Sequence, residues 1–187
     1  MSIGYIILGL IAAAAVYHVF AYNNFVKLKN LVAEGWSGID VQLRRRADLI
    51  PNLVETVKGY ASHEDKIFRD LAELRAKSIQ GGTVAETSGV AQAMSAALGR
   101  LFAIAEAYPE LKADANFRDL QDKLAMIEDE LQLARRYYNG SVRNLNTAVE
   151  SFPGNVIANF FKFTKAEFFE LGDEAARQVP KVEFNKA

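Results

Sequence analysis

The chain has 187 residues, a formal net charge of −1, 24% charged residues and 50% apolar residues. This composition indicates one packed domain with a small appendage at most, and it excludes wholesale disorder. The near-neutral charge argues against general nucleic-acid binding, which requires a basic surface. The absence of cysteine excludes disulfides, thiolate metal sites, iron–sulfur clusters and a cysteine nucleophile.

Residues 3–22 form an apolar stretch in which His18 is the only basic or acidic side chain. As a helix, these 20 residues would span about 30 Å, the thickness of the hydrocarbon layer of a bilayer. Aromatic side chains near the end of a span are typical of the membrane interface. We therefore expect contacts with lipid or with another protomer from Tyr17, Phe20 and Tyr22.

A cleaved signal peptide is the alternative interpretation of this stretch. Residues 1–4 lack the positive charge that a signal peptide carries, so we expect an uncleaved anchor over residues 1–22. No lysine or arginine precedes the stretch, whereas residues 27–46 hold five basic and two acidic groups. The positive-inside rule then predicts a single-pass protein with its N-terminus outside and the rest of the chain cytoplasmic.

The spacing of apolar residues predicts four further helices. Over residues 23–61 apolar or small side chains recur every 3.6 residues. Pro51 lies inside this pattern and either kinks the helix or begins a new one; the pattern keeps its phase, which favours a kink. Similar patterns predict helices over residues 63–80, 84–108 and 114–152, the last with a coiled-coil seam over five heptads.

Helix lengths decide how these four helices can be arranged. They are about 58, 27, 37 and 57 Å long, so an up-and-down order returns the chain to the level of the membrane. The predicted fold is therefore all-α. It consists of the anchor, a long antiparallel four-helix bundle over residues 23–152, a short Phe-rich helical segment over 153–170, and an extended tail over 171–187.

Six of the twelve phenylalanines lie in residues 152–170. This segment is either a hydrophobic plug under the bundle or an interfacial element that touches lipid or a neighbouring protomer. The predicted position at the membrane end favours the second interpretation. The candidate contacts are Phe160, Phe161, Phe163, Phe168 and Phe169.

The tail holds Val182 and Phe184, which alternate as in a short extended segment. Such a segment docks on a partner by adding a strand or filling a groove. A frayed terminus is the alternative.

The sequence contains no catalytic or phosphate-binding motif, so we expect no catalytic, cofactor or metal residues and no enzymatic activity. His18 is interpreted as a residue at the membrane edge. His63, beside two acidic residues, offers too few ligands for a metal site.

Two charge clusters fall at nearly the same height on the first and fourth predicted helices. We hypothesise that they face each other, with Arg45 opposite Asp129. The alternative is two separately solvated faces, and exposed pairs contribute under about 1 kcal/mol. The clusters are Arg44, Arg45 and Arg46 on one helix and Glu128, Asp129 and Glu130 on the other.

Several motifs, taken in order, resemble the LemA family. They are DVQLRRRADLIPNLVETVKGY at 40–60, AEAYPELK at 105–112, ARRYYN at 134–139, ESFP at 150–153, the Phe-rich segment through Phe169, and PKVEF at 180–184. The resemblance implies a protein of the bacterial inner (cytoplasmic) membrane with an N-terminal helix and a four-helix bundle. It implies no enzymatic activity and no defined ligand.

These features lead to two hypotheses for the function. The first is a self-associating membrane scaffold that organises or shapes the bacterial membrane, with the lipid bilayer and other copies of itself as partners. The second is an adaptor or signal transducer that binds another envelope protein, for example in a membrane protease system. An enzyme is disfavoured because the sequence shows no convergent catalytic groups.

Overall fold

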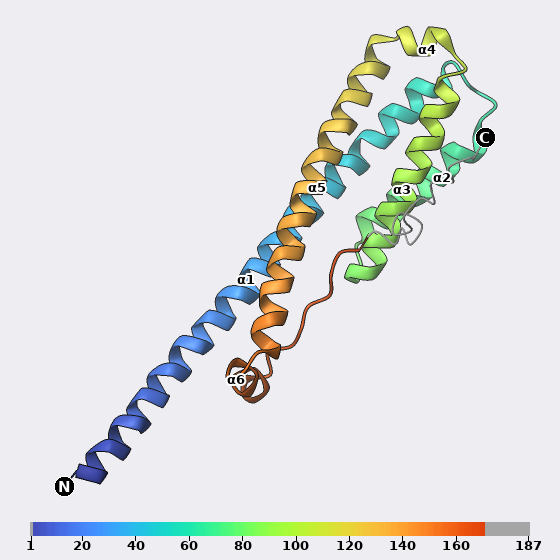
Figure 1. Ribbon diagram of the computed structural model, residues 1–187. Coiled ribbons are helices and arrows are strands. Elements are labelled where there is room, and N and C mark those ends of the chain that lie inside the picture. Colours follow the sequence, from blue (N-terminus) through green and yellow to red (C-terminus); the bar gives the residue numbers. More distant parts are fainter. Residues whose placement is uncertain (1, 171–187) are drawn as a thin grey trace, which may run out of the picture.

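The computed structural model describes residues 2–170, and this part of the chain contains helices and no strand. The prediction of an all-helical protein with a long apolar N-terminal helix is confirmed. In Figure 1, α1 runs the length of the molecule and α5 lies beside it, while α6 lies where α5 ends. The helices are α1 (Ser2–Lys58), α2 (Asp65–Gln80), α3 (Val84–Ala105), α4 (Pro109–Ala113), α5 (Ala115–Glu150) and α6 (Gly154–Phe161).

The first helix is continuous from the apolar stretch into the folded body. It passes through Pro51, although proline has no N–H to donate to the carbonyl four residues earlier. That carbonyl belongs to Ala47, and it accepts a hydrogen bond from Nε of Arg75 on α2 at 3.1 Å. A side chain from the neighbouring helix therefore satisfies the acceptor that Pro51 leaves free.

Helix α1 makes its most extensive contacts with α5, and α2 packs on both α1 and α3. The two long helices approach closely at Gly35, where a Cβ atom would lie 2.9 Å from the Cα of Tyr138. The absence of a side chain at this position is what permits the approach.

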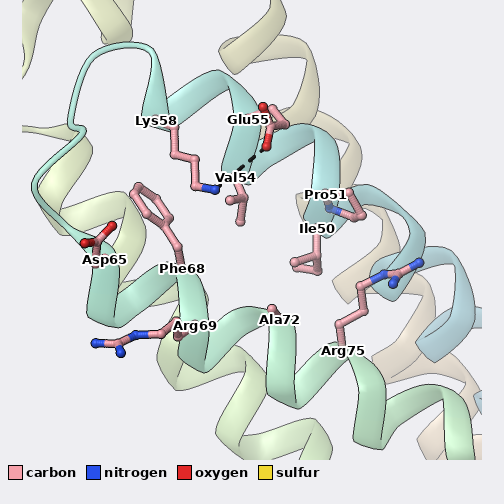
Figure 2. Close-up of a pocket in the computed structure, with 10 residues that line it drawn as sticks. All are labelled: Ile50, Pro51, Val54, Glu55, Lys58, Asp65, Phe68, Arg69, Ala72 and Arg75. Carbon is pink, nitrogen blue, oxygen red and sulfur yellow. Dashed lines mark ion pairs between the residues drawn. The ribbon is translucent and has the colours of Figure 1, made fainter.

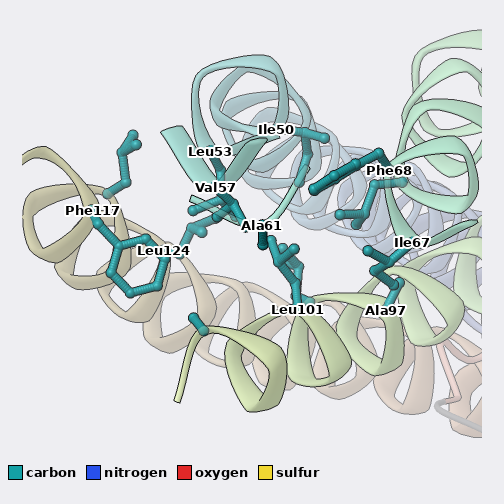
Figure 3. Close-up of a cluster of buried hydrophobic side chains, with 14 of the residues drawn as sticks. Ile50, Leu53, Val57, Ala61, Ile67, Phe68, Ala97, Leu101, Phe117 and Leu124 are labelled. Carbon is teal, nitrogen blue, oxygen red and sulfur yellow. The ribbon is translucent and has the colours of Figure 1, made fainter. Parts of the chain in front are cut away.

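Three buried clusters follow one another along the molecule. The first, in Figure 3, joins α1, α2, α3 and α5 at the end far from the N-terminus and includes Leu53, Val57, Leu71, Leu101 and Leu124. The second joins α1, α3 and α5 with Phe169 and includes Ile39, Leu43, Ala91, Leu131, Tyr138 and Val142. The third joins α1, α5 and α6 and consists of Phe25, Leu145, Ile157 and Ala158.

Helices α3 and α5 begin with side-chain caps, which satisfy backbone N–H groups that have no partner inside the helix. Helix α3 begins with a capping box between Thr83 and Glu86. The carboxylate of Asp114 accepts from the backbone N–H of Phe117 at 2.9 Å and caps α5. The short helix α4 between them was not predicted from the sequence.

Candidate membrane-facing site

The N-terminal part of α1 extends beyond the rest of the described fold (Figure 1). By length and composition it can cross a membrane, and none of its most apolar 18-residue window is buried. Tyr17 and Phe20, two of the expected interface residues, are 42% and 71% exposed. The ring of His18 lies with Nδ1 2.7 Å from the carbonyl of Ala14, one turn earlier in the same helix.

Helix α6 docks where the apolar stretch of α1 ends. Its inner face consists of Ile157 and Ala158, which are buried against Phe25 of α1 and Leu145 of α5. Gly154 begins α6 so close to α5 that a Cβ atom there would lie 2.7 Å from the carbonyl oxygen of Ala148. The fold therefore fixes α6 against both long helices.

The outer face of α6 is also apolar, and it is uncovered. Phe152, Val156 and Phe160 are 82%, 56% and 78% exposed. Val156 and Phe160 are four residues apart on one face of α6, and Phe152 lies two residues before the helix begins; we call these three exposed residues the outer stripe. A helix that is apolar on both faces is normally enclosed by protein or membrane, so the outer stripe is a candidate contact surface.

The other predicted aromatic residues divide between packing and exposure. Phe161 and Phe163 hold α6 on α1, with ring centroids 4.9 and 5.7 Å from that of Tyr22. Phe169 is 2% exposed in the second cluster, whereas Phe168 is 40% exposed. The segment therefore contains both packed aromatic residues, which the plug interpretation expects, and exposed ones, which the interface interpretation expects.

Residues 162–170 form an extended strap that runs from α6 back along α5 toward α3 (Figure 1). Asn146 holds both backbone groups of Ala166, with the N–H donating to its Oδ1 at 2.9 Å and the carbonyl accepting from its Nδ2 at 3.0 Å. Asn139 holds Phe169 in the same way, at 2.9 and 3.1 Å.

The two asparagines match the strap in spacing. They are seven residues apart on α5, about 10 Å along the helix axis. The residues that they hold are three apart in extended chain, also about 10 Å. Two further bonds complete the attachment, from the hydroxyl of Tyr138 to the carbonyl of Glu167 at 2.8 Å and from the hydroxyl of Ser88 to the carbonyl of Glu170.

The two predicted charge clusters meet at two points. Arg45 Nη1 lies 2.9 Å from Glu130 Oε2, with both side chains about half exposed. Arg46 is 3% exposed, and its Nη1 lies 3.2 Å from Glu128 Oε2. Glu128 also accepts from Arg135 at 2.7 Å.

Arg46 donates further to Ser95 Oγ at 3.0 Å and to the carbonyl of Ala91 at 3.1 Å, so it links α1 to α3 as well as to α5. Burial lowers the pKa of Arg46, and the charge of Glu128 opposes that shift.

The remaining cluster residues do not join the two helices. Arg44 pairs with Asp40 of its own helix at 2.9 Å. Asp129 is exposed and forms no ion pair within residues 2–170, so the expected partner of Arg45 is corrected to Glu130. Helix rotation decides this pairing, because successive residues point about 100° apart.

The expected docking residues of the tail, Val182 and Phe184, lie outside the residues that the structure describes. Among those that it does describe, no group of three histidine or carboxylate side chains could hold a metal ion.

Some residues of this site were not predicted from the sequence. Val156 of the outer stripe is one of them, although its spacing of four residues from Phe160 was a signal. Asn139 and Asn146 are the others, and their signal is a pair of polar residues one heptad apart beside an apolar seam.

The fold and this site define a class: an all-helical protein with a long apolar N-terminal helix and an uncovered apolar surface where that stretch ends. The LemA family model matches residues 35–184, and the chain belongs to the LemA family.

Among similar proteins are Magnetosome protein MamQ 2 of Paramagnetospirillum magneticum, 24% identical over 80% of this chain, and Magnetosome protein MamQ of Magnetospirillum gryphiswaldense, 25% identical over 79%. Protein LemA of Metamycoplasma hominis is 22% identical over 81% of this chain and 69% of its own length. The chain spans 64% of the length of the two MamQ proteins.

Proposed function

We propose that this protein is a membrane-anchored helical scaffold that self-associates and organises or shapes the bacterial inner membrane. Residues 1–22 act as the anchor. Helices α1, α2, α3 and α5 act as one antiparallel bundle that stands on the cytoplasmic side. The five basic residues within residues 27–46 support this orientation.

The observation that carries the proposal is the position of the outer stripe. The ring of Tyr22, the last residue of the apolar stretch, contacts Phe161 of α6 at a centroid distance of 4.9 Å. When the stretch spans a bilayer, α6 therefore lies at the membrane surface and its outer stripe rests on lipid. Burying one phenylalanine contributes about 1.5–3 kcal/mol, so the stripe adds substantially to attachment.

The composition of the span supports self-association. It carries small residues at Gly9, Ala12 and Ala13, and small residues let membrane helices approach one another closely. The similarity to proteins named for the magnetosome supports a role at a membrane.

The first experiment measures the mass of the full-length protein in mild detergent by light scattering, with the detergent subtracted, followed by negative-stain imaging. We expect a large and uniform particle. A monomer would overturn the scaffold and favour an adaptor that binds another envelope protein.

A second experiment tests whether the outer stripe contacts lipid. Because the chain has no cysteine, Phe160→Cys gives one labelling site for a polarity-sensitive dye. In vesicles we expect blue-shifted emission and quenching by spin-labelled acyl chains. Met126→Cys on α5 is the matched control, since Met126 is 58% exposed but distant from α6. Unquenched emission at position 160 would refute lipid contact, and a blue shift without quenching would place another protomer there.

A further inference from the structure

A cavity of about 480 Å³ lies between α1, the beginning of α3 and the strap. This volume falls within the range of small-molecule binding sites. Its walls are mainly apolar, and Trp36 of α1 packs there on Tyr138 at a centroid distance of 5.6 Å. The other large apolar side chains of the wall are Val32, Val84, Leu145 and Phe163.

Three lysines line the same cavity: Lys29 from α1, and Lys162 and Lys165 from the strap. Lys165 Nζ pairs with Glu150 at 2.8 Å, and this hydrogen bond raises the pKa of Lys165. Lys29 and Lys162 are exposed and form no ion pair in the part of the chain that the structure describes. Two uncompensated positive charges therefore border the cavity, which favours an anionic ligand.

The height of these lysines indicates the source of the anion. Lys29 follows Tyr22 by seven residues, about 10 Å along α1. The polar headgroup layer extends about 5–8 Å beyond the hydrocarbon, and a lysine side chain readily extends its charge toward it. Lys162 directly follows α6, the helix placed at the membrane surface. Both charges thus lie within reach of lipid phosphates.

We propose that this cavity binds the headgroup of an anionic phospholipid. The phosphate is held by Lys29 and Lys162, and the headgroup alcohol enters the cavity, with its carbon atoms against Trp36 and its hydroxyls near Thr164. The inference rests on the proposed function, because the cavity meets lipid only when the N-terminal stretch of α1 spans a bilayer. It adds selectivity for lipid charge, which the outer stripe cannot provide.

Trp36 makes a direct test possible, since it is the only tryptophan in the chain. The full-length protein in a nonionic detergent is titrated with dihexanoylphosphatidylglycerol or dihexanoylphosphatidylcholine while tryptophan emission is recorded. We expect a saturable change with the phosphatidylglycerol and none with the phosphatidylcholine.

The double variant Lys29→Gln/Lys162→Gln should weaken this binding about twenty-five-fold, or about five-fold for each lysine. The matched control is Lys66→Gln/Lys112→Gln, whose exposed lysines lie at the opposite end of the fold and which should bind like the unaltered protein.

Several results would overturn the inference. An equal response to both lipids would show that charge does not determine binding, and unchanged binding by the double lysine variant would exclude the named residues. Binding of glycerol 3-phosphate as tight as that of the phosphatidylglycerol would identify a soluble ligand. Particle mass in detergent and quenching of the label at position 160 in vesicles are measured separately, so absence of headgroup binding with both as expected overturns the headgroup site alone.

Discussion

The hydrogen bond from Arg75 to the carbonyl that Pro51 leaves free gives a quantitative prediction. Pro51 cannot donate to the carbonyl of Ala47, and Arg75 donates to that carbonyl instead, at 3.1 Å. Figure 2 shows Arg75 and Pro51 on facing helices, with Arg69 on α2 six residues before Arg75. Replacing Pro51 by alanine restores the backbone donor, so the effect of losing Arg75 should depend on the residue at position 51.

The magnitudes follow from the hydrogen bond. A bond from a charged donor contributes about 1.5–3 kcal/mol, and the half-buried position of Arg75 reduces this to about 1–2 kcal/mol for Arg75→Met. With Pro51→Ala the carbonyl of Ala47 keeps a partner, and we expect Arg75→Met to cost about 0.5 kcal/mol. The coupling energy between the two positions is then about 1 kcal/mol.

The assay is a double-mutant cycle on the full-length protein in detergent, with chemical denaturation followed by circular dichroism. Pro51→Ala alone should stabilise, because an interior proline disfavours a helix by about 3 kcal/mol, less the gain in unfolded-state freedom. Arg69→Met is the control: Arg69 lines the same surface pocket as Pro51 and Arg75, but its side chain forms no hydrogen bond within residues 2–170, so its effect should not depend on the residue at position 51. Additive effects of Pro51→Ala and Arg75→Met would refute the reasoning.

Three further predictions concern stability. Glu128→Gln should lower the free energy of unfolding by about 2–3 kcal/mol, because Glu128 pairs with two largely buried guanidinium groups. Glu130→Gln, which alters an exposed pair, should lower it by less than about 1 kcal/mol. Thermal melts compare the two variants, and equal shifts in melting temperature would contradict this difference between a buried and an exposed pair. Gly35→Ala should lower the melting temperature and loosen the α1–α5 pair, since its Cβ would lie 2.9 Å from the Cα of Tyr138. The backbone hydrogen bond that caps α5 lowers the pKa of Asp114 in the folded protein. The cap therefore stabilises the fold fully above about pH 3.9, the pKa of an unfolded aspartate, and loses this effect as the pH falls through the lower pKa of the folded state. Asp114→Ala should flatten this acid dependence of the melting temperature.

The sequence was sufficient for those features that depend on a repeating pattern. The 3.6-residue spacing from Phe25 to Ala61 crosses Pro51 in phase, and α1 is continuous there. It could not reveal that Arg75 satisfies Ala47, because residues 28 apart meet only through the packing of α2 on α1. The same applies to α6: its Phe-rich composition was evident, but which side faces outward depends on the close fit of Gly154 beside Ala148.

The charge clusters also show which features the sequence predicts and which depend on packing. Helix length gave the heights of the two clusters, and arginines of one do meet glutamates of the other. Rotation about the axis, which length does not fix, selects Glu130 for Arg45 and leaves Asp129 toward solvent. Arg44 had a carboxylate one turn away at Asp40, a local partner that competes with any contact across helices.

The strap holds the short helix α6 rigidly to the long body of the fold. Asn146 and Asn139 each fix both backbone groups of one strap residue, and Phe169 is buried in the second cluster. Because the carbonyl of Glu170 in the strap accepts a hydrogen bond from the hydroxyl of Ser88, the strap also connects α6 to α3. A displacement of α6 would therefore break bonds along α5 and expose Phe169, so the outer stripe keeps a fixed angle to the long axis. The proposed scaffold function requires that fixed angle, since flexible attachment would leave neighbouring copies without a defined orientation.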